Sequence, residues 1–350
     1  MRVRWGFVIA GVAVVLLAAA PIAAGPPAPA HHTKAPTPSQ PIASSYQQGL
    51  NVMLYRTSTG RHVQQSLRQW HAWHITDISL VFPLVQSGPY ASDVGPGAIT
   101  PSMATLRHVV AELQASGFRV MLRPLLDEGS LTPKGFWRGD IAPDSVAAWF
   151  ASYQKAVVQY AALAQQQHVQ AYDIGTELVS LQGYSSEWTN LIAAVRRVYH
   201  GQLLYSANWT DLTPESWFAL LNEIGIDAYF PLTPANAGTV PSTAQLESAW
   251  ASWLAKLPTY PRPLVITELG VLPVANSYRA PYLWNLPGSP YSPATQANFY
   301  SAGCQAWRPR TVGIYWWGVF WGPPHQYSST SFAPTPQGAD AIRSCFAAAG

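Results

Sequence analysis

The sequence has few charged residues and only two cysteines, and these shortages exclude several functional classes. Its 350 residues include 20 lysines and arginines and 17 acidic residues, with a formal net charge of +3. Charge this dilute, without basic clusters interleaved with aromatics, argues against a nucleic-acid partner. The two cysteines are far apart, and the nine histidines show no ligand spacing beyond His71 and His74. We therefore expect no metal site and no cofactor.

Aromatic and apolar residues, in contrast, are abundant. Hydrophobic residues make up 48% of the chain, which suffices for a large core and excludes disorder outside the ends. The 15 tryptophans and 17 tyrosines suit core packing, and flat rings with polar edges also suit clefts that bind sugars.

The N-terminal part is typical of an export and linker region. Residues 1–24 combine a basic start with an apolar run and small residues, which predicts a secretory signal peptide. Cleavage would fall after Ala24 or at Ala28-Pro29-Ala30; an uncleaved membrane anchor is the alternative, because the run is almost long enough to span a bilayer. Six prolines predict an extended linker over 25–45. We expect a secreted protein, or one anchored on the outer face of a membrane, with its folded domain over 46–350.

Cys304 and Cys345 carry the only thiols of the chain. In an exported protein we expect them to form a disulfide between the last helix and the helix before the final strand. Closing such a loop would contribute roughly 3–4 kcal/mol. Two buried free thiols are the alternative.

Eight short apolar runs alternate with helical patterns along the rest of the chain. We expect strands at 49–55, 77–85, 118–127, 171–178, 202–209, 223–230, 263–270 and 312–320. Helical patterns follow at 60–73, 101–116, 144–167, 186–199, from 213 onward, 242–257, 293–307 and 337–348. This alternation implies parallel strands covered on both faces, and eight units predict a single (β/α)8 TIM barrel. An open doubly wound sheet is disfavoured, because no glycine-rich phosphate loop follows the first strand.

Acidic residues are few enough to assign individually. Most lie on expected helices, at strand starts, within strands or in loops. Asp127, Glu128, Glu177 and Glu268 lie at the carboxyl ends of expected strands, the face that carries the active site in TIM-barrel enzymes. Only Glu177 and Glu268 end matched motifs, Gly-Thr-Glu-Leu and Ile-Thr-Glu-Leu-Gly.

Glu177 and Glu268 end the fourth and seventh expected strands, which lie on opposite sides of an eight-stranded barrel. Their side chains can therefore face each other across its mouth. Paired carboxyl groups suit glycoside hydrolysis, at about 5–5.5 Å for a retaining mechanism and farther apart for an inverting one. One must be protonated to deliver a proton to the leaving oxygen, and the other must be ionised.

At these motifs the chain resembles the clan A glycoside hydrolases, which carry the acid/base after strand four and the nucleophile after strand seven. The ordered segments LRPLLD, FWRGDI, YDIGTEL, YSANW, IGIDAYFPL, ITELG and YWW are similar to glycoside hydrolase family 113, from about Leu50 to Ala341. The resemblance implies a retaining β-mannanase with Glu177 as acid/base and Glu268 as nucleophile, acting on a polysaccharide or oligosaccharide. We expect it to be a monomer.

Four positions, in two segments of the chain, depart from the pattern that the resemblance implies. Clan A enzymes commonly have Asn immediately before the acid/base, where this chain, like family 113, has Thr176. The contact to the sugar 2-hydroxyl must then come from elsewhere, and Asn208 at the end of the fifth strand is our candidate. The family often has Lys where Arg123 stands, with polar residues at Leu125 and Leu126, which bears on mannan specificity more than on hydrolysis.

Residues near the later strand ends are candidate substrate contacts. Tyr229, beside the seventh strand, is predicted to donate a hydrogen bond to Glu268, and a tyrosine of the barrel wall is the alternative. Trp316 and Trp317 are adjacent, so their side chains point to opposite faces of a strand. One would form the floor of a sugar subsite, and the other would pack under a helix.

The segment around the third strand supplies further candidates. Trp137 and Arg138 lie in its following loop, where they would shape a subsite, or where a salt bridge to Asp127 or Asp140 would hold the loop. Arg123 and Asp127 are four apart on one strand, so both can point inward. They are either substrate contacts or a structural ion pair.

Two functions from different classes fit these observations. The first is a secreted retaining β-glycanase, most simply a β-1,4-mannanase, with an exo-acting mannosidase as a variant. The second is a catalytically silent carbohydrate-binding protein that keeps the barrel and its aromatic cleft. Release of reducing ends from a polysaccharide distinguishes them.

Overall fold

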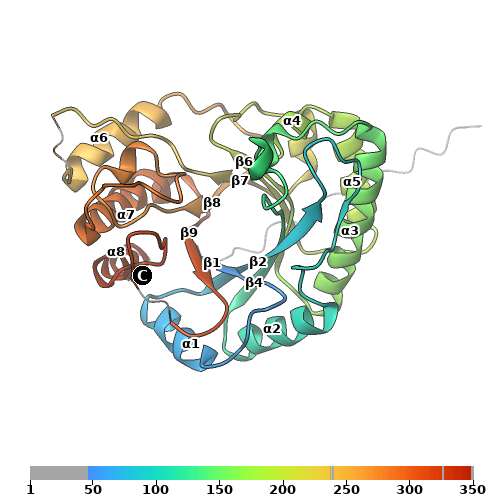
Figure 1. Ribbon diagram of the computed structural model, residues 1–350, viewed down its shortest axis with the longest axis horizontal. Coiled ribbons are helices and arrows are strands. Elements are labelled where there is room, and N and C mark those ends of the chain that lie inside the picture. Colours follow the sequence, from blue (N-terminus) through green and yellow to red (C-terminus); the bar gives the residue numbers. More distant parts are fainter. Residues whose placement is uncertain (1–45, 237, 239, 325–326, 348–350) are drawn as a thin grey trace, which may run out of the picture. The chain divides into compact units, whose positions relative to one another are not determined.

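Eight parallel strands form a closed barrel in the structure, a computed structural model (Figure 1). The structure describes residues 46–350 except 237, 239, 325–326 and 348–350, so the predicted signal peptide and linker lie outside the described residues. The strands follow the order β1-β2-β4-β5-β6-β7-β8-β9, and β1 pairs with both β2 and β9. The predicted (β/α)8 barrel is confirmed.

The barrel strands lie close to the predicted apolar runs. They are β1 (Gln47–Met53), β2 (Asp77–Gln86), β4 (Arg119–Leu126), β5 (Ala171–Thr176), β6 (Gln202–Asn208), β7 (Glu223–Asp227), β8 (Leu264–Leu269) and β9 (Gly313–Phe320). The short β3 (Val94–Gly95) pairs antiparallel with the end of β2. The runs predict these strands well because both faces of each strand are covered, so nearly every strand residue is buried and many are apolar.

Helices surround the barrel, as Figure 1 shows. The α-helices are α1 (Val63–Ala72), α2 (Met103–Ala115), α3 (Val146–Gln166), α4 (Val179–Gln182), α5 (Ser185–Arg196), α6 (Thr243–Leu254), α7 (Pro293–Trp307) and α8 (Pro336–Ala347). Short 3-10 helices lie at η1 (Thr132–Lys134), η2 (Arg138–Asp140), η3 (Ser216–Leu220), η4 (Ser277–Arg279) and η5 (Arg308–Arg310). Of the helices within the described part of the chain, none is long and apolar enough to cross a bilayer.

One predicted helix is wrong. We expected an α-helix from Thr213 after the fifth barrel strand, but only η3 forms there. Glu215 has an extended backbone and its side chain caps nothing. Trp217 is buried, and its ring stacks on that of Trp188 at 4.8 Å. Burying these large aromatic rings against the barrel outweighs the helix-start signal, which is only a weak preference.

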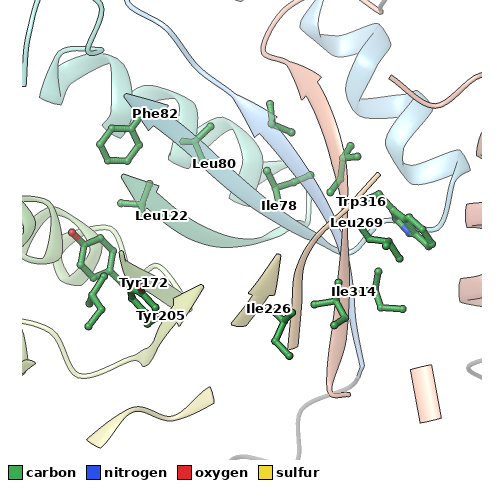
Figure 2. Close-up of a cluster of buried hydrophobic side chains, with 14 of the residues drawn as sticks. Ile78, Leu80, Phe82, Leu122, Tyr172, Tyr205, Ile226, Leu269, Ile314 and Trp316 are labelled. Atoms are coloured by element: carbon green, nitrogen blue, oxygen red, sulfur yellow. The ribbon is translucent and has the colours of Figure 1, made fainter. Parts of the chain in front are cut away.

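Buried apolar side chains fill the space between the barrel and its helices (Figure 2). Alternate residues of one strand, such as Ile78, Leu80 and Phe82, belong to this layer because strand side chains alternate between faces. A separate apolar cluster consists of Met121, Ala171, Leu204, Val265 and Tyr315. Two positions farther along their strands, Arg123 and Thr267 are buried polar residues.

The predicted disulfide is present. Cys304 in α7 and Cys345 in α8 are bonded across a sequence separation of 41 residues. The bond joins the last helix to the helix before the final barrel strand, as the sequence predicted.

Candidate active site

Glu177 and Glu268 line the same cavity, of about 410 Å³. Glu177 directly follows β5, and Glu268 lies near the end of β8. Barrel strands that are far apart in sequence thus bring the two predicted carboxylates together. The aromatic residues lining the cavity are Trp137, Trp209, Tyr229, Tyr282, Trp284, Trp317 and Phe332.

Glu177 is held in place by its backbone and by two side-chain donors. Its backbone is left-handed, with φ 56°, which costs a residue with a side chain roughly 1–3 kcal/mol, and its N–H donates to the Ser206 carbonyl at 2.8 Å. Asn208 Nδ2 donates to Glu177 Oε1 at 2.5 Å, and Arg138 Nη1 donates to Oε2 at 2.8 Å. The Asn208 amide oxygen accepts from the Thr210 N–H and hydroxyl, which orients its amide nitrogen toward Glu177.

Glu268 has two different partners. Arg123 Nη2 lies 2.9 Å from Glu268 Oε1, and the Tyr229 hydroxyl donates to Oε2 at 2.7 Å. The predicted hydrogen bond from Tyr229 is therefore confirmed. The hydrogen bond from Tyr229 and the positive charge of Arg123 both favour the ionised form of the carboxylate.

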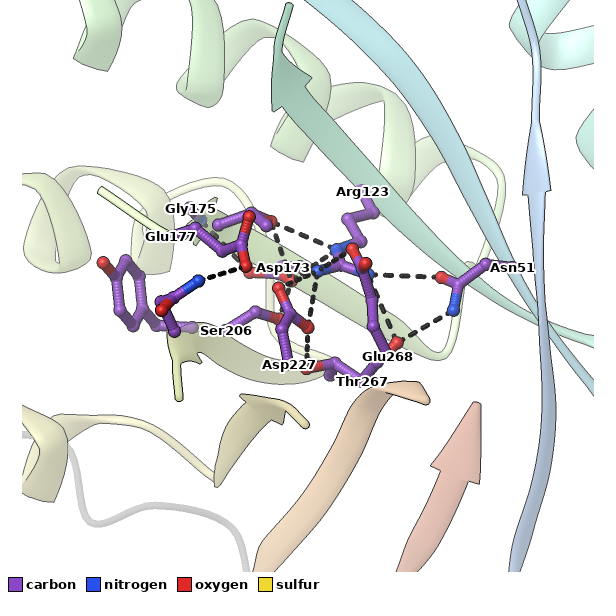
Figure 3. Close-up of polar contacts among 12 residues, drawn as sticks. Asn51, Arg123, Asp173, Gly175, Glu177, Ser206, Asp227, Thr267 and Glu268 are labelled. Carbon is purple, nitrogen blue, oxygen red and sulfur yellow. Dashed lines mark hydrogen bonds and ion pairs between the residues drawn. The ribbon is translucent and has the colours of Figure 1, made fainter. Parts of the chain in front are cut away.

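Arg123 lies beneath the cavity in a buried ionic network (Figure 3). Its side chain has no exposed surface, and its guanidinium contacts Asp173 at 3.1 Å, Asp227 at 2.9 Å and Glu268 at 2.9 Å. Further polar partners are Asn51, Thr176 and Thr267. The prediction of a substrate contact or an ion pair with Asp127 is wrong, because Arg123 is inside the barrel and Asp127 lies beyond the end of β4.

Burial raises the pKa of Glu177 to about 7. The negative charge of Asp227 adds to this increase, whereas the Arg138 guanidinium and the Asn208 hydrogen bond oppose it. Near neutral pH the Glu177 carboxyl therefore carries a proton in part of the molecules.

Burial also raises the pKa of Glu268 well above its usual value. The charge of Asp227 adds to the increase, and the Arg123 guanidinium opposes it. One guanidinium contacts the three carboxylates Asp173, Asp227 and Glu268 and can neutralise only one of them. These groups therefore titrate together, with protons shared over the network.

The comparisons with known proteins show the family and the fold of this chain. Residues 54–333 match the family model of Glycoside Hydrolase Family 113. The chain belongs to glycoside hydrolase family 113. It is a glycoside hydrolase, and the recognition from the sequence motifs is confirmed. A sequence comparison with curated proteins found no match.

Solved structures of the family have the same fold as this hydrolase. One is the family 113 β-mannanase of Alicyclobacillus acidocaldarius in complex with ManMIm, at 21% identity and a TM-score of 0.71, covering 88% of this chain and 99% of that one. Another is a family 113 β-1,4-mannanase complex at 18% identity and a TM-score of 0.74, covering 87% and 99%. At these identities the similarity establishes the fold.

The two adjacent tryptophans of the hydrolase separate as predicted. Trp317 lines the cavity. Trp316 is fully buried on the other face of β9, where its ring lies 4.7 Å from that of Tyr300 in α7. Trp316 as a substrate contact is therefore wrong, because alternation along the strand places it under the helices.

The loop after β4 brings Trp137 and Arg138 to the cavity. Arg138 pairs with Glu177 and Glu128 rather than with Asp127 or Asp140, so of the two alternatives the loop salt bridge is wrong. The reason is local: Arg138 Nε donates to the Leu126 carbonyl at 3.0 Å, which aims the guanidinium into the cavity.

Asp127 faces a second hollow beside the cavity. This hollow has a volume of about 220 Å³ and shares Glu128, Arg138, Trp284 and Trp317 with the cavity. The Asp127 carboxylate accepts from the Gly129 N–H at 2.8 Å. Asp127 therefore stays a candidate substrate contact, in the hollow beside the cavity that Glu177 and Glu268 line.

Several residues of the cavity were not predicted from the sequence. Trp209 and Tyr282 stack with ring centroids 5.9 Å apart, and Trp284 is 54% exposed at the cavity. Tyr282 and Trp284 belong to the long segment between β8 and α7. Large exposed aromatics after the strand that carries Glu268 were the available signal. Glu128, a fourth strand-end acid, also lines the cavity.

Proposed function

We propose that this hydrolase cleaves β-1,4-linked mannan with retention of configuration, using Glu177 as acid/base and Glu268 as nucleophile. The observation that carries the proposal is that both glutamates line one cavity and that each has its own cationic and hydrogen-bonding partners. Arg123 and Tyr229 contact Glu268, and Asn208 and Arg138 contact Glu177. Solved structures with this fold include β-mannanases, which supports the choice of mannan.

In the first step, a Glu268 carboxylate oxygen attacks the anomeric carbon. The bond between this carbon and the leaving oxygen breaks, and its electron pair goes to that oxygen. Glu177 delivers its proton to the same oxygen, so the departing sugar leaves as an alcohol. Glu268 is then bound covalently to the sugar, and Glu177 is ionised.

In the second step, Glu177 acts as the base. It takes a proton from water as the water oxygen attacks the anomeric carbon, and the bond to Glu268 breaks with its electron pair returning to the carboxylate. Each step inverts the configuration at the anomeric carbon, so the two steps together retain it. The step restores protonated Glu177 and ionised Glu268.

The partners of the two glutamates fit these roles. The guanidinium of Arg123 and the hydroxyl of Tyr229 stabilise the charge on Glu268 and fix its orientation. Glu177, with a pKa raised to about 7, can hold a proton near neutral pH and release it, as an acid/base must.

The aromatic side chains fit a polysaccharide ligand. Trp317, Trp284 and the stacked pair of Trp209 and Tyr282 line the cavity, and flat rings pack against the apolar faces of sugars. The exposed rings of Tyr282 and Trp284 extend the contact surface beyond one sugar unit, which favours a chain-like substrate. We also propose that the protein is secreted, since the N-terminal pattern is that of a signal peptide and a disulfide is typical of exported proteins.

The test is hydrolysis of mannan, glucomannan, xylan and cellulose oligomers, with product analysis. We expect release of reducing ends from mannan and loss of turnover in Glu268→Ala. Azide should restore turnover of Glu268→Ala and give a glycosyl azide of inverted configuration. Equal residual activity in wild type, Glu177→Gln and Glu268→Gln would contradict the proposal.

A further inference from the structure

Arg138 contacts the carboxyl group that the proposed reaction needs in its protonated form. Arg138 Nη1 lies 2.8 Å from Glu177 Oε2, and the exposed fractions of the two side chains are 15% and 8%. A guanidinium at this distance favours the ionised form of a carboxyl group. Unless something balances Arg138, it would therefore remove the proton that the first step requires.

Glu128 supplies a balancing charge on the other side of Arg138. Arg138 Nη2 lies 3.3 Å from Glu128 Oε1, and the Arg138 backbone N–H donates to the same oxygen at 3.2 Å. With its Nε on the Leu126 carbonyl, the guanidinium is held on three sides. Glu128 and Glu177 thus share one cation.

The other groups that face Glu177 belong to the barrel strands. They are Asp227 on β7, Glu268 on β8, Arg123 on β4, Asn208 and Tyr205 on β6, and Tyr229 after β7. Arg123, Asp227 and Glu268 form one buried network. Glu128 makes no ion pair with that network and is 29% exposed, so its charge can be removed without breaking the network.

We propose that Glu128 and Arg138 form a charge-balancing pair for Glu177. Glu128 offsets the guanidinium charge while Glu177 holds its proton. When that proton moves to the leaving oxygen, its electron pair stays on Glu177, and Arg138 stabilises the new carboxylate. Arg138 and Glu128 are positioning residues, and this inference rests on the proposed function.

The pair predicts pH shifts of opposite sign. Glu128→Gln keeps an oxygen acceptor for Arg138 but removes the negative charge, which favours the ionised form of Glu177 and lowers its pKa. The basic limb of the kcat/KM profile should therefore shift to lower pH by about one unit. Arg138→Gln removes the positive charge, so the same limb should shift to higher pH by a similar amount, and the maximal rate should fall. Arg138→Lys, which keeps a positive charge, should restore the limb toward the wild-type position. Asp140→Asn is the matched control: it changes the charge of an exposed residue of the same loop that is not among the ion-pair partners of Arg138, and it should leave the limb in place.

A titration without substrate separates this inference from the proposed function. Carbon-13 NMR of the labelled glutamate carboxyls, with Glu177→Gln identifying the resonance, reports the Glu177 pKa directly. If the Glu177 pKa falls in Glu128→Gln and rises in Arg138→Gln but the protein hydrolyses no glycan, the pair is supported and the proposed function is contradicted. Normal hydrolysis with an unchanged Glu177 titration, or with shifts of the same sign, would overturn the pair. If Arg138→Gln does not fold, Glu128→Gln decides alone, because only a downward shift supports the pair.

Discussion

The guanidinium of Arg123 lies 2.9 Å from the carboxylate of Glu268, although Arg123 itself has no exposed surface. The same nitrogen lies 2.9 Å from Asp227. Arg123 therefore does not contact the substrate itself and acts on it through Glu268 and the other carboxylates of the network. The planar guanidinium of Arg123 also contacts several oxygen atoms at once, which the compact ammonium group of a lysine cannot do.

Arg123→Lys should lower kcat/KM by roughly 100-fold, because the ammonium group of lysine cannot contact Asp173, Asp227 and Glu268 together and the ion pair with Glu268 is weakened. Steady-state kinetics on mannan oligomers would measure this, with circular dichroism to confirm folding. A folded variant with wild-type kinetics would show that Arg123 does not orient Glu268.

Tyr229→Phe should slow the reaction and move the acid limb of the pH profile upward. The Tyr229 hydroxyl donates to Glu268 at 2.7 Å, and this hydrogen bond opposes the increase in the Glu268 pKa. Without it, Glu268 becomes ionised only at higher pH. Tyr282→Phe is the matched control, since it removes a hydroxyl from a cavity residue that is 46% exposed. An unmoved acid limb in Tyr229→Phe would contradict the assigned role.

Glu177→Gln should stabilise the protein above pH 7. Burial raises the folded-state pKa of Glu177 from 4.5 to about 7, so the contribution of the protonated group to stability is fully present below pH 4.5 and is lost as the pH rises through 7. Glutamine cannot ionise, so the variant should gain up to about 3 kcal/mol in the free energy of unfolding at alkaline pH and little at pH 4.

Urea denaturation of wild type and Glu177→Gln at several pH values would measure this difference. Glu247→Gln on the outer helix α6 is the control for the same chemical change away from the cavity. A constant difference between wild type and Glu177→Gln across pH would show that the Glu177 pKa is not raised.

Cys304→Ser with Cys345→Ser should lower the free energy of unfolding by roughly 3–4 kcal/mol, because the disulfide closes a loop of 41 residues in the unfolded chain. Reduction of the wild type should have a similar effect on the melting temperature. Neither cysteine lines the catalytic cavity, so the rate at 25 °C should be retained. A large loss of rate in a folded variant would point to coupling between α7, α8 and the cavity.

Trp284→Ala should raise KM for mannan oligomers about tenfold with a smaller effect on kcat. Its ring is 54% exposed at the cavity, so its loss removes a sugar contact and little of the core. Tyr184→Ala, another exposed aromatic outside the cavity lining, is the control. An unchanged KM in Trp284→Ala would exclude this ring from the substrate surface.

The sequence was sufficient for the architecture because its signals are local. Buried parallel strands need apolar runs on both faces, and eight such runs alternating with helical patterns leave few folds to consider. The segment after β6 shows the limit, because its helix-start residues were overridden by the burial of Trp217.

The charge partners could not be predicted from the sequence. Arg123 and Asp227 are separated by 104 positions, and their pairing depends on the register of strands that meet only in the closed barrel. Arg138 pairs with Glu177 instead of Asp127 because the Leu126 carbonyl anchors its Nε. The sequence did signal a buried cation, because Asp173 and Asp227 lie within strands and an isolated charge in a core is costly.

The sequence by itself determined the barrel, the disulfide partners and the two glutamates at strand ends, since periodicity and rare residue types are written along the chain. Only the tertiary structure decided which cation contacts which carboxylate, which tryptophan of the pair reaches the cavity wall and that Glu128 faces Arg138. These outcomes depend on distances of a few ångströms between distant segments, over which ionic and hydrogen-bond energies change steeply.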